Sequence, residues 1–144
     1  MTACIMCRRW QDEPDLRIIE LEHSFVQLNR DQFFPGYSFV IAREHYSELF
    51  HLDQQTRQAL IEEVNQVAGA LYQVYTPTKM NYELLGNMVP HMHWHLVPRF
   101  DTDPLWPRPI WSELHRDKVL TPEQYRTEIE KIRQALKPTE CIGS

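Results

Sequence analysis

The sequence has no apolar run that approaches the roughly 18 residues needed to cross a bilayer, so we expect no membrane-spanning segment. It has no surplus of basic residues either: 15 Lys and Arg stand against 20 Asp and Glu, a formal net charge of −5. General nucleic-acid binders and anionic-membrane binders need a basic face, so we expect neither kind of partner. The start of the chain lacks the basic stretch and apolar core of a signal peptide, which predicts a cytoplasmic protein.

Glycine and cysteine are both scarce. There are four glycines and no Gly/Ser-rich stretch that could act as a linker, so 1–144 is interpreted as one domain. Three cysteines are an odd count, which excludes a complete disulfide framework. Two of them, Cys4 and Cys7, form a C-x-x-C motif typical of metal or redox chemistry. With 42% hydrophobic and 24% charged residues, the composition is that of an ordinary globular domain.

Two hydrophobic periods are visible along the chain. Apolar residues at three- and four-residue steps predict a helix over 53–75, and a capping box at Thr121 and Gln124 predicts another that runs to about residue 136. Short runs rich in β-forming residues, separated by turn residues, predict five strands: 16–20, 24–29, 37–42, 79–85 and 91–97. Strands joined by short turns pair in antiparallel fashion, so the predicted class is α+β.

One segment reads Pro-His-Met-His-Trp-His-Leu-Val-Pro-Arg. Successive side chains of a strand point to opposite faces, so His91, His93 and His95 are predicted to share one face and Met92 and Trp94 the other. A single histidine there is most simply a polar residue on a half-exposed strand, but three in strict alternation are not explained that way. Two chemistries stay open from the residues alone: metal binding, and a nucleophilic imidazole aligned by its neighbours.

That segment resembles the His-φ-His-φ-His-φ-φ signature of the histidine triad (HIT) family of nucleotide hydrolases and transferases. Leu-Asn-Arg at 28–30 with Pro-Gly at 35–36 is similar to the family's substrate-side strand and its turn. Val-Ile-Ala-Arg-Glu-His at 40–45 resembles its Val-Ile-Pro-Lys-x-His stretch, with Ala and Arg in place of Pro and Lys. The sequence is therefore identified as a member of the HIT family. The resemblance implies a HIT-like fold: an antiparallel sheet of about five strands, one long helix and a C-terminal helix.

The resemblance also implies a two-step reaction. His93, the middle histidine, would attack the α-phosphorus of a nucleotide to give a covalent nucleotidyl-histidine, from which water releases the nucleoside monophosphate. His95 would contact the phosphate or protonate the leaving group. Asn29 matches the family residue that contacts the ribose. Asn81 and Asn87 lie near the family's amide side chains ahead of the triad, and Asn87 would contact the phosphate region.

The third histidine bears on the reaction type. Family members that hand the nucleotide to phosphate or a sugar phosphate usually have Gln there, so His95 resembles the hydrolase branches. The implied substrate is an adenine dinucleotide, such as diadenosine tetraphosphate, or an adenosine phosphoramidate. Two alternatives stay open: a nucleotidyltransferase of the same family, and a non-catalytic nucleotide-binding or zinc-stapled interaction module.

The C-x-x-C motif also has a counterpart in zinc-containing members of the family. Carried over residue by residue, the resemblance implies a structural zinc site made of Cys4, Cys7, His45 and His91, a closed Cys₂His₂ set. His91 would then position the strand and leave His93 free for chemistry. The alternative is that the two cysteines are simply reduced thiols.

The segment between residues 99 and 120 is predicted to be a long loop. Its Trp106 and Trp111 are interpreted either as a stacking segment at the nucleotide site or as anchors that hold the loop to the core. Arg99, at the start of the loop, either meets a substrate phosphate or pairs with one of the 20 acidic residues.

We also expect a homodimer. HIT proteins resemble one another in forming two-fold dimers, in which the partner's C-terminal segment approaches the active site. The helix predicted over 53–75 adds a reason from the residues, because Ala70, Tyr72 and Val74 lie outside its main apolar stripe or at its margin. Such a margin suggests a second buried surface.

Overall fold

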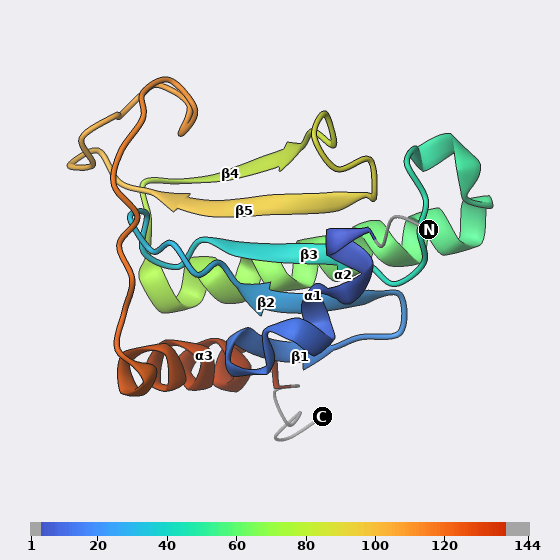
Figure 1. Ribbon diagram of the computed structural model, residues 1–144, viewed down its shortest axis with the longest axis horizontal. Coiled ribbons are helices and arrows are strands. Elements are labelled where there is room, and N and C mark those ends of the chain that lie inside the picture. Colours follow the sequence, from blue (N-terminus) through green and yellow to red (C-terminus); the bar gives the residue numbers. More distant parts are fainter. Residues whose placement is uncertain (1–3, 138–144) are drawn as a thin grey trace, which may run out of the picture.

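The computed structural model describes residues 4–137 and has a five-stranded antiparallel sheet at its centre (Figure 1). The strands run in the order β1-β2-β3-β5-β4. Their bounds are β1 Arg17–Glu20, β2 Ser24–Leu28, β3 Ser38–Ala42, β4 Lys79–Leu84 and β5 His93–Arg99. The helices are α1 Ile5–Asp12, α2 Gln54–Tyr75 and α3 Pro122–Leu136, with short 3-10 turns η1 Pro14–Leu16 and η2 Leu49–His51. The predicted α+β class, antiparallel sheet and two main helices are confirmed.

The ends of α2 and α3 follow from local chemistry. The side chain of Asp53 accepts a hydrogen bond from a backbone N–H in the first turn of α2, and the helix ends at Thr76, whose left-handed backbone (φ 44°) precedes Pro77. The predicted capping box of Thr121 and Gln124 starts α3. Within residues 4–137, none of the helices combines the length and the apolar character that a membrane span requires.

Because successive side chains of a strand point to opposite faces, the sheet contributes to two separate hydrophobic cores, one on each face. One face packs under α2 and α3 through side chains that include Val26, Leu28, Val40, Trp94 and Leu96. The opposite face packs against α1 and the loop after β5 through Met6, Phe39, Ile41, Val97, Leu105 and Ile110. Figure 1 shows α1 in front of the sheet and α2 behind it. The second face is the one that carries the histidines.

Two local predictions are wrong. Helix α1 was not predicted, because eight residues are too few to form a stable helix by propensity and Cys4 at its N-cap makes no side-chain cap; packing of Met6 against the sheet holds it. The predicted strand over 91–97 instead begins at His93 and continues through Pro98 to Arg99. Proline is tolerated there because the ladder to β3 ends at Leu96, which leaves Pro98 with β4 as its only neighbouring strand.

The margin of α2 is mostly buried within the chain itself rather than left for a partner to cover. Ala70 is buried, and Val74 is partly buried against the core. Tyr72 alone of the three stays exposed. The expectation of a homodimer therefore loses the support drawn from Ala70 and Val74.

Candidate active site

The pairing of the strands places side chains from four strands in one row on the sheet face opposite α2. His95 on β5 lies opposite Phe39 on β3 and opposite Glu83 on β4, and Phe39 in turn lies opposite Gln27 on β2. His93 follows two residues earlier on the same face of β5. The structure therefore brings His93 and His95 together as predicted, with ring centroids 4.9 Å apart.

His93 is held as a neutral imidazole with one free nitrogen. Its Nδ1 lies 2.6 Å from the backbone carbonyl oxygen of His91, which can only accept, so the ring proton is on Nδ1. The Nε2 lone pair is then free. Burial lowers the pKa of His93, because removal from water disfavours the charged imidazolium. A neutral imidazole fixed in one tautomer is a competent nucleophile.

His95 has a partner that the sequence did not reveal. The hydroxyl of Tyr37 lies 2.6 Å from Nδ1 of His95, and burial raises the pKa of this phenol, so it keeps its proton and donates to the ring. That hydrogen bond leaves the Nε2–H of His95 as a donor. Burial, followed by the neighbouring charge of His93 and then that of Arg9, lowers the pKa of His95 to about 4.

The low pKa of His95 predicts an acid-sensitive stability. The unfolded chain takes up a proton at this residue below its ordinary pKa of 6.5, whereas the folded chain takes it up only near pH 4. The free energy of unfolding should therefore fall as the pH drops from about 6.5 to about 4, by roughly 3 kcal/mol at most from this group. Urea unfolding across this range should show a shallower pH slope for His95→Gln than for wild type. An unchanged slope would contradict the assignment; His51→Gln, at an exposed histidine, is the control.

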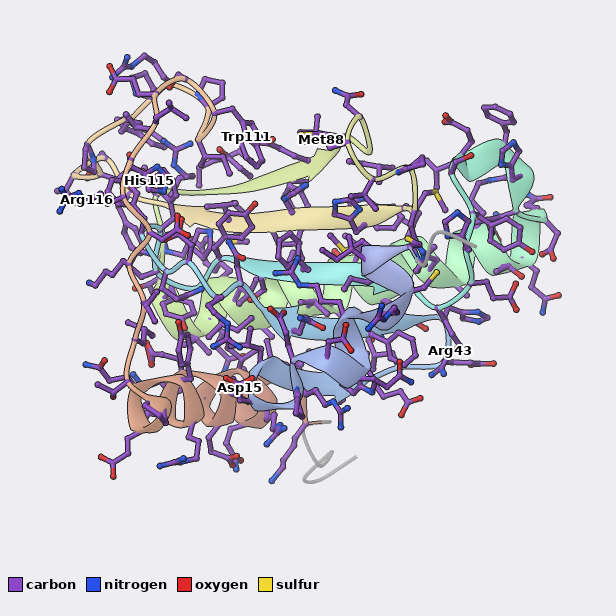
Figure 2. All side chains as sticks on the ribbon, in the orientation of Figure 1. Asp15, Arg43, Met88, Trp111, His115 and Arg116 are labelled. Carbon is purple, nitrogen blue, oxygen red and sulfur yellow. The ribbon has the colours of Figure 1, made fainter. Side chains whose placement is uncertain are left out.

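A pocket of about 260 Å³ opens beside the two histidines. Its other lining residues come from the β4–β5 connection, including Asn87 and Met88, and from Trp111. The Trp111 ring meets His95 edge to face at 5.4 Å, and its indole N–H donates to the carboxylate of Glu83. Figure 2 shows Trp111 and Met88 at the β4 side of the sheet. The loop after β5 thus closes one side of the pocket within the same chain.

The predicted amide and arginine residues separate into two groups. Exposed Asn87 lines the pocket, and half-buried Asn29 follows the end of β2, where its backbone N–H donates to the carbonyl of Tyr37. Asn81 instead accepts a hydrogen bond from Arg99, which is only 1% exposed. Of the two interpretations of Arg99, the structure shows the ion pair.

Arg99 is the centre of a buried network. Its guanidinium makes two bonds to the carboxylate of Asp103, at 2.7 and 3.1 Å, and others to the Asn81 side chain and the Arg108 carbonyl. Burial alone would raise the pKa of Asp103. Hydrogen bonds from Arg99 and from backbone N–H groups lower it by more than burial raises it, so the pKa lies below its usual range. This network holds the start of the loop that places Trp111 beside the pocket.

Removing this buried charge should destabilise the protein strongly. Arg99→Met leaves the Asp103 carboxylate buried and unpaired, so we expect the free energy of unfolding to fall by roughly 3–5 kcal/mol. Arg108→Gln is the matched control, because that side chain forms an exposed pair with Glu113 and should cost at most about 1 kcal/mol. Chemical denaturation of both variants gives the comparison. Equal losses would show that the Arg99 network contributes no more than a surface ion pair.

The predicted metal ligands converge at the end of the sheet where β5 begins. The Nδ1 atoms of His45 and His91 lie 3.2 Å apart, Cys7 Sγ lies 3.3 Å from each of them, and Cys4 Sγ lies 3.7 Å from His91 Nδ1. Tetrahedral zinc places its nitrogen and sulfur ligands about 3.3–3.8 Å from one another. His91 Nε2–H donates to the carbonyl of Ala42 at 2.6 Å, so its Nδ1 presents a lone pair to the cluster. The four residues fit a zinc ion.

His91 lies just before β5, and its side chain belongs to the cysteine cluster. Its backbone carbonyl accepts a hydrogen bond from Nδ1–H of His93. The prediction that His91 is part of the strand is wrong, because β5 and its ladder to β3 begin at His93.

Comparison with known proteins decides the family. The HIT domain family matches residues 11–102. The chain belongs to the HIT family. Among HIT relatives, a HIT-like protein of Mycoplasma genitalium is 29% identical over 107 residues, which cover 70% of this chain and 76% of that one. The adenosine 5′-monophosphoramidase of Saccharomyces cerevisiae is 25% identical over 101 residues, covering 69% of this chain and 64% of that one.

Solved structures agree with this assignment to the HIT family. A histidine triad protein from Sinorhizobium meliloti matches with a TM-score of 0.78 and 28% identity, covering 87% of this chain and 93% of that one. A zinc-bound histidine triad protein from Mycobacterium smegmatis has the same fold, with a TM-score of 0.65 and 20% identity over 93% of each chain. The predicted HIT-like fold is confirmed.

Proposed function

We propose that this HIT protein is a nucleotide hydrolase that cleaves its substrate at the α-phosphorus with His93 as the nucleophile. The observation that carries the proposal is the 2.6 Å hydrogen bond from His93 Nδ1 to the His91 carbonyl. This hydrogen bond leaves Nε2, the other ring nitrogen, with a free lone pair, and His93 lines the pocket described above. Some HIT relatives support the class of reaction: one is an adenosine 5′-monophosphoramidase, and another, from Arabidopsis thaliana, is an adenylylsulfatase.

The reaction proceeds in two displacements. In the first, the Nε2 lone pair of His93 forms a bond to the α-phosphorus, and the leaving group departs with the electrons of its own bond to phosphorus, an amine leaving group taking up a proton from solvent. In the second, a water oxygen attacks the phosphorus, the N–P bond returns its electrons to Nε2, and a proton from that water passes to solvent. The products are the nucleoside monophosphate and the free leaving group.

The geometry favours one of the two roles considered for His95. With a pKa of about 4 this residue is neutral at pH 7 and is a poor proton donor to a leaving group. Its Nε2–H, fixed by Tyr37, is instead a hydrogen-bond donor to a phosphate oxygen. Asn87 lines the same pocket and is the second proposed phosphate contact. Asn29 does not line this pocket and is kept as the proposed ribose contact from its match to the family residue alone.

The assigned activities of two relatives favour a compact leaving group. One is an adenosine 5′-monophosphoramidase and the other an adenylylsulfatase. We therefore place an adenosine phosphoramidate ahead of a diadenosine polyphosphate as substrate.

A substrate panel tests this function. Purified protein is incubated with adenosine phosphoramidate, adenylyl sulfate or diadenosine tetraphosphate, and AMP is measured by chromatography. We expect AMP from all three classes or from the first two, with the highest kcat/KM for the phosphoramidate. Nucleotide binding without AMP release would favour the non-catalytic module. Formation of a new nucleotide only when phosphate or a sugar phosphate is added would favour the transferase.

We also propose that the Cys4, Cys7, His45 and His91 cluster holds a structural zinc ion. Bound there, zinc supplies no reaction step and serves as a cross-link between chain segments. The ligands tie the start of α1 to the chain after β3 and to the residue whose carbonyl orients His93.

A two-fold dimer is a further part of the proposal. The edge strand β4 and the connection after it expose Tyr82, Leu85 and Met88, the last at 95%. An exposed strand edge with apolar side chains beside it is a surface that a second copy can cover. Light scattering at low micromolar concentration should give about twice 17.3 kDa. A mass near 17.3 kDa would remove the dimer from the proposal.

A further inference from the structure

Arg9 of α1 extends over the face of the sheet that carries the histidine pair. Its guanidinium carbon lies 4.6 Å from the centroid of the Phe39 ring. The same ring meets His93 at 6.0 Å and His95 at 5.2 Å between centroids, edge to face in both cases. Phe39 therefore has the guanidinium of Arg9 and both histidine rings as neighbours.

The hydrogen-bonding capacity of Arg9 is mostly unused. Its Nε–H donates to the carboxylate of Glu13 at 2.9 Å, but neither terminal amino group has a partner within residues 4–137, although only 17% of the side chain is exposed. Glu13 also accepts from Gln27, whose own Oε1 is buried without a donor. Arg99, the other mostly buried arginine on this face, uses both terminal amino groups. The terminal amino groups of Arg9 are donors that a ligand could satisfy.

The positive charge of Arg9 lowers a pKa at the proposed active site. Burial is the main cause of the low pKa of His95, and the positive charges of His93 and then of Arg9 add to it. Phosphoryl chemistry relies on fixed positive charge and hydrogen-bond donors at the phosphate oxygens, and a planar guanidinium is well suited to bind two of them. Within residues 4–137, Arg9 is the arginine or lysine whose charge acts on His95.

We propose that Arg9 binds the α-phosphate of the substrate and stabilises the charge on it during transfer to His93. This role rests on the hydrolase function proposed above. The substrate phosphate would take up the terminal amino groups of Arg9 while Glu13 continues to hold Nε. Since α1 starts between Cys4 and Cys7, the cysteine cluster would set the position of Arg9 as well as that of His93.

Equilibrium binding separates this role from turnover. In a His93→Ala background, which forms no covalent adduct, AMP and adenosine are titrated by calorimetry. Adding Arg9→Gln should weaken AMP binding by about 10- to 100-fold and change adenosine binding by less than about twofold, because adenosine has no phosphate. An equal loss for the two ligands would overturn the proposal. If the His93→Ala protein binds no AMP, the nucleotide function itself is wrong and the role of Arg9 falls with it.

Kinetics with matched variants distinguishes a phosphate contact from an ion pair. Arg9→Gln should lower kcat/KM by about 10- to 100-fold, Arg9→Lys should restore part of the loss, and Glu13→Gln should cost much less than Arg9→Gln. Arg8→Gln is the control, because Arg8 makes the same i,i+4 pair on the exposed side of α1, with Asp12. Melting temperature and zinc content confirm that each variant is folded. Equal losses for Arg9→Gln and Glu13→Gln would mean that Arg9 only stabilises α1, and full activity of Arg9→Gln would likewise refute its role.

Discussion

Replacing His93 by alanine should lower turnover of a nucleoside phosphoramidate by roughly 10⁴-fold or more, because loss of the nucleophile removes the covalent path altogether. Nucleotide binding should be largely retained, since the substitution leaves the pocket wall, Tyr37 and His95 in place. The measurement is AMP release under steady-state conditions, with binding followed separately by calorimetry.

A trapped intermediate gives a second test of the same step. Wild-type protein, quenched in the steady state with labelled substrate, should carry a nucleotide on His93 that is stable to base and labile to acid, as expected of an N–P bond. His23→Ala replaces a histidine in the β1–β2 turn, away from the site, and should turn over normally. Turnover by His93→Ala close to the wild-type rate would exclude His93 as the nucleophile.

Much of the fold was predictable because local signals and tertiary packing agree. Local sequence signals predicted α2 from its apolar stripe, α3 from its capping box and the strands from runs of β-forming residues. Each of these elements is present in the structure. The shared face of His93 and His95 followed from the two-residue period of a strand alone. No contact with another part of the chain was needed for any of these.

Features that depend on strand register could not be predicted. Tyr37 lies 58 positions before His95 in the sequence, and the contact exists because β3 and β5 pair with Phe39 opposite His95. The role of Arg99 was undecidable for the same reason, since Asp103 is only one of 20 acidic residues until the loop is placed. Long-range pairing decides such contacts, and local propensity carries no information about it.

Helix α1 was missed for a different physical reason. Eight residues cannot form a stable helix in water by propensity, so this one exists because Met6 and Trp10 pack on the sheet and because its first turn carries the cysteine cluster. The Trp10 ring stacks on Phe25 at 5.0 Å. The C-x-x-C motif pointed to a metal, but it did not indicate that the same turn carries Arg9 toward the histidines.

Removal of zinc should destabilise the protein and slow the reaction together. Metal bound only by the folded state adds directly to folding free energy. Loss of one ligand should cost on the order of 3–5 kcal/mol, which for a domain of this size lowers the melting temperature by about 10 °C. Protein purified without added metal should contain close to one zinc per chain by elemental analysis. Activity should fall as well, because His91 is both a ligand and the acceptor that orients His93.

A pair of histidine variants makes the zinc prediction specific. His45→Gln removes a proposed ligand, whereas His51→Gln alters an exposed histidine six residues further along, whose side chain contacts Ser47 and Phe50 and is not part of the cluster. We expect His45→Gln to lose zinc and to melt at the temperature of chelator-treated wild type, with no further decrease when chelator is added. His51→Gln should keep the metal and the wild-type melting temperature. Metal-free wild-type protein with unchanged melting and activity would show that Cys4 and Cys7 are ordinary thiols, and would leave His93 oriented by the backbone alone.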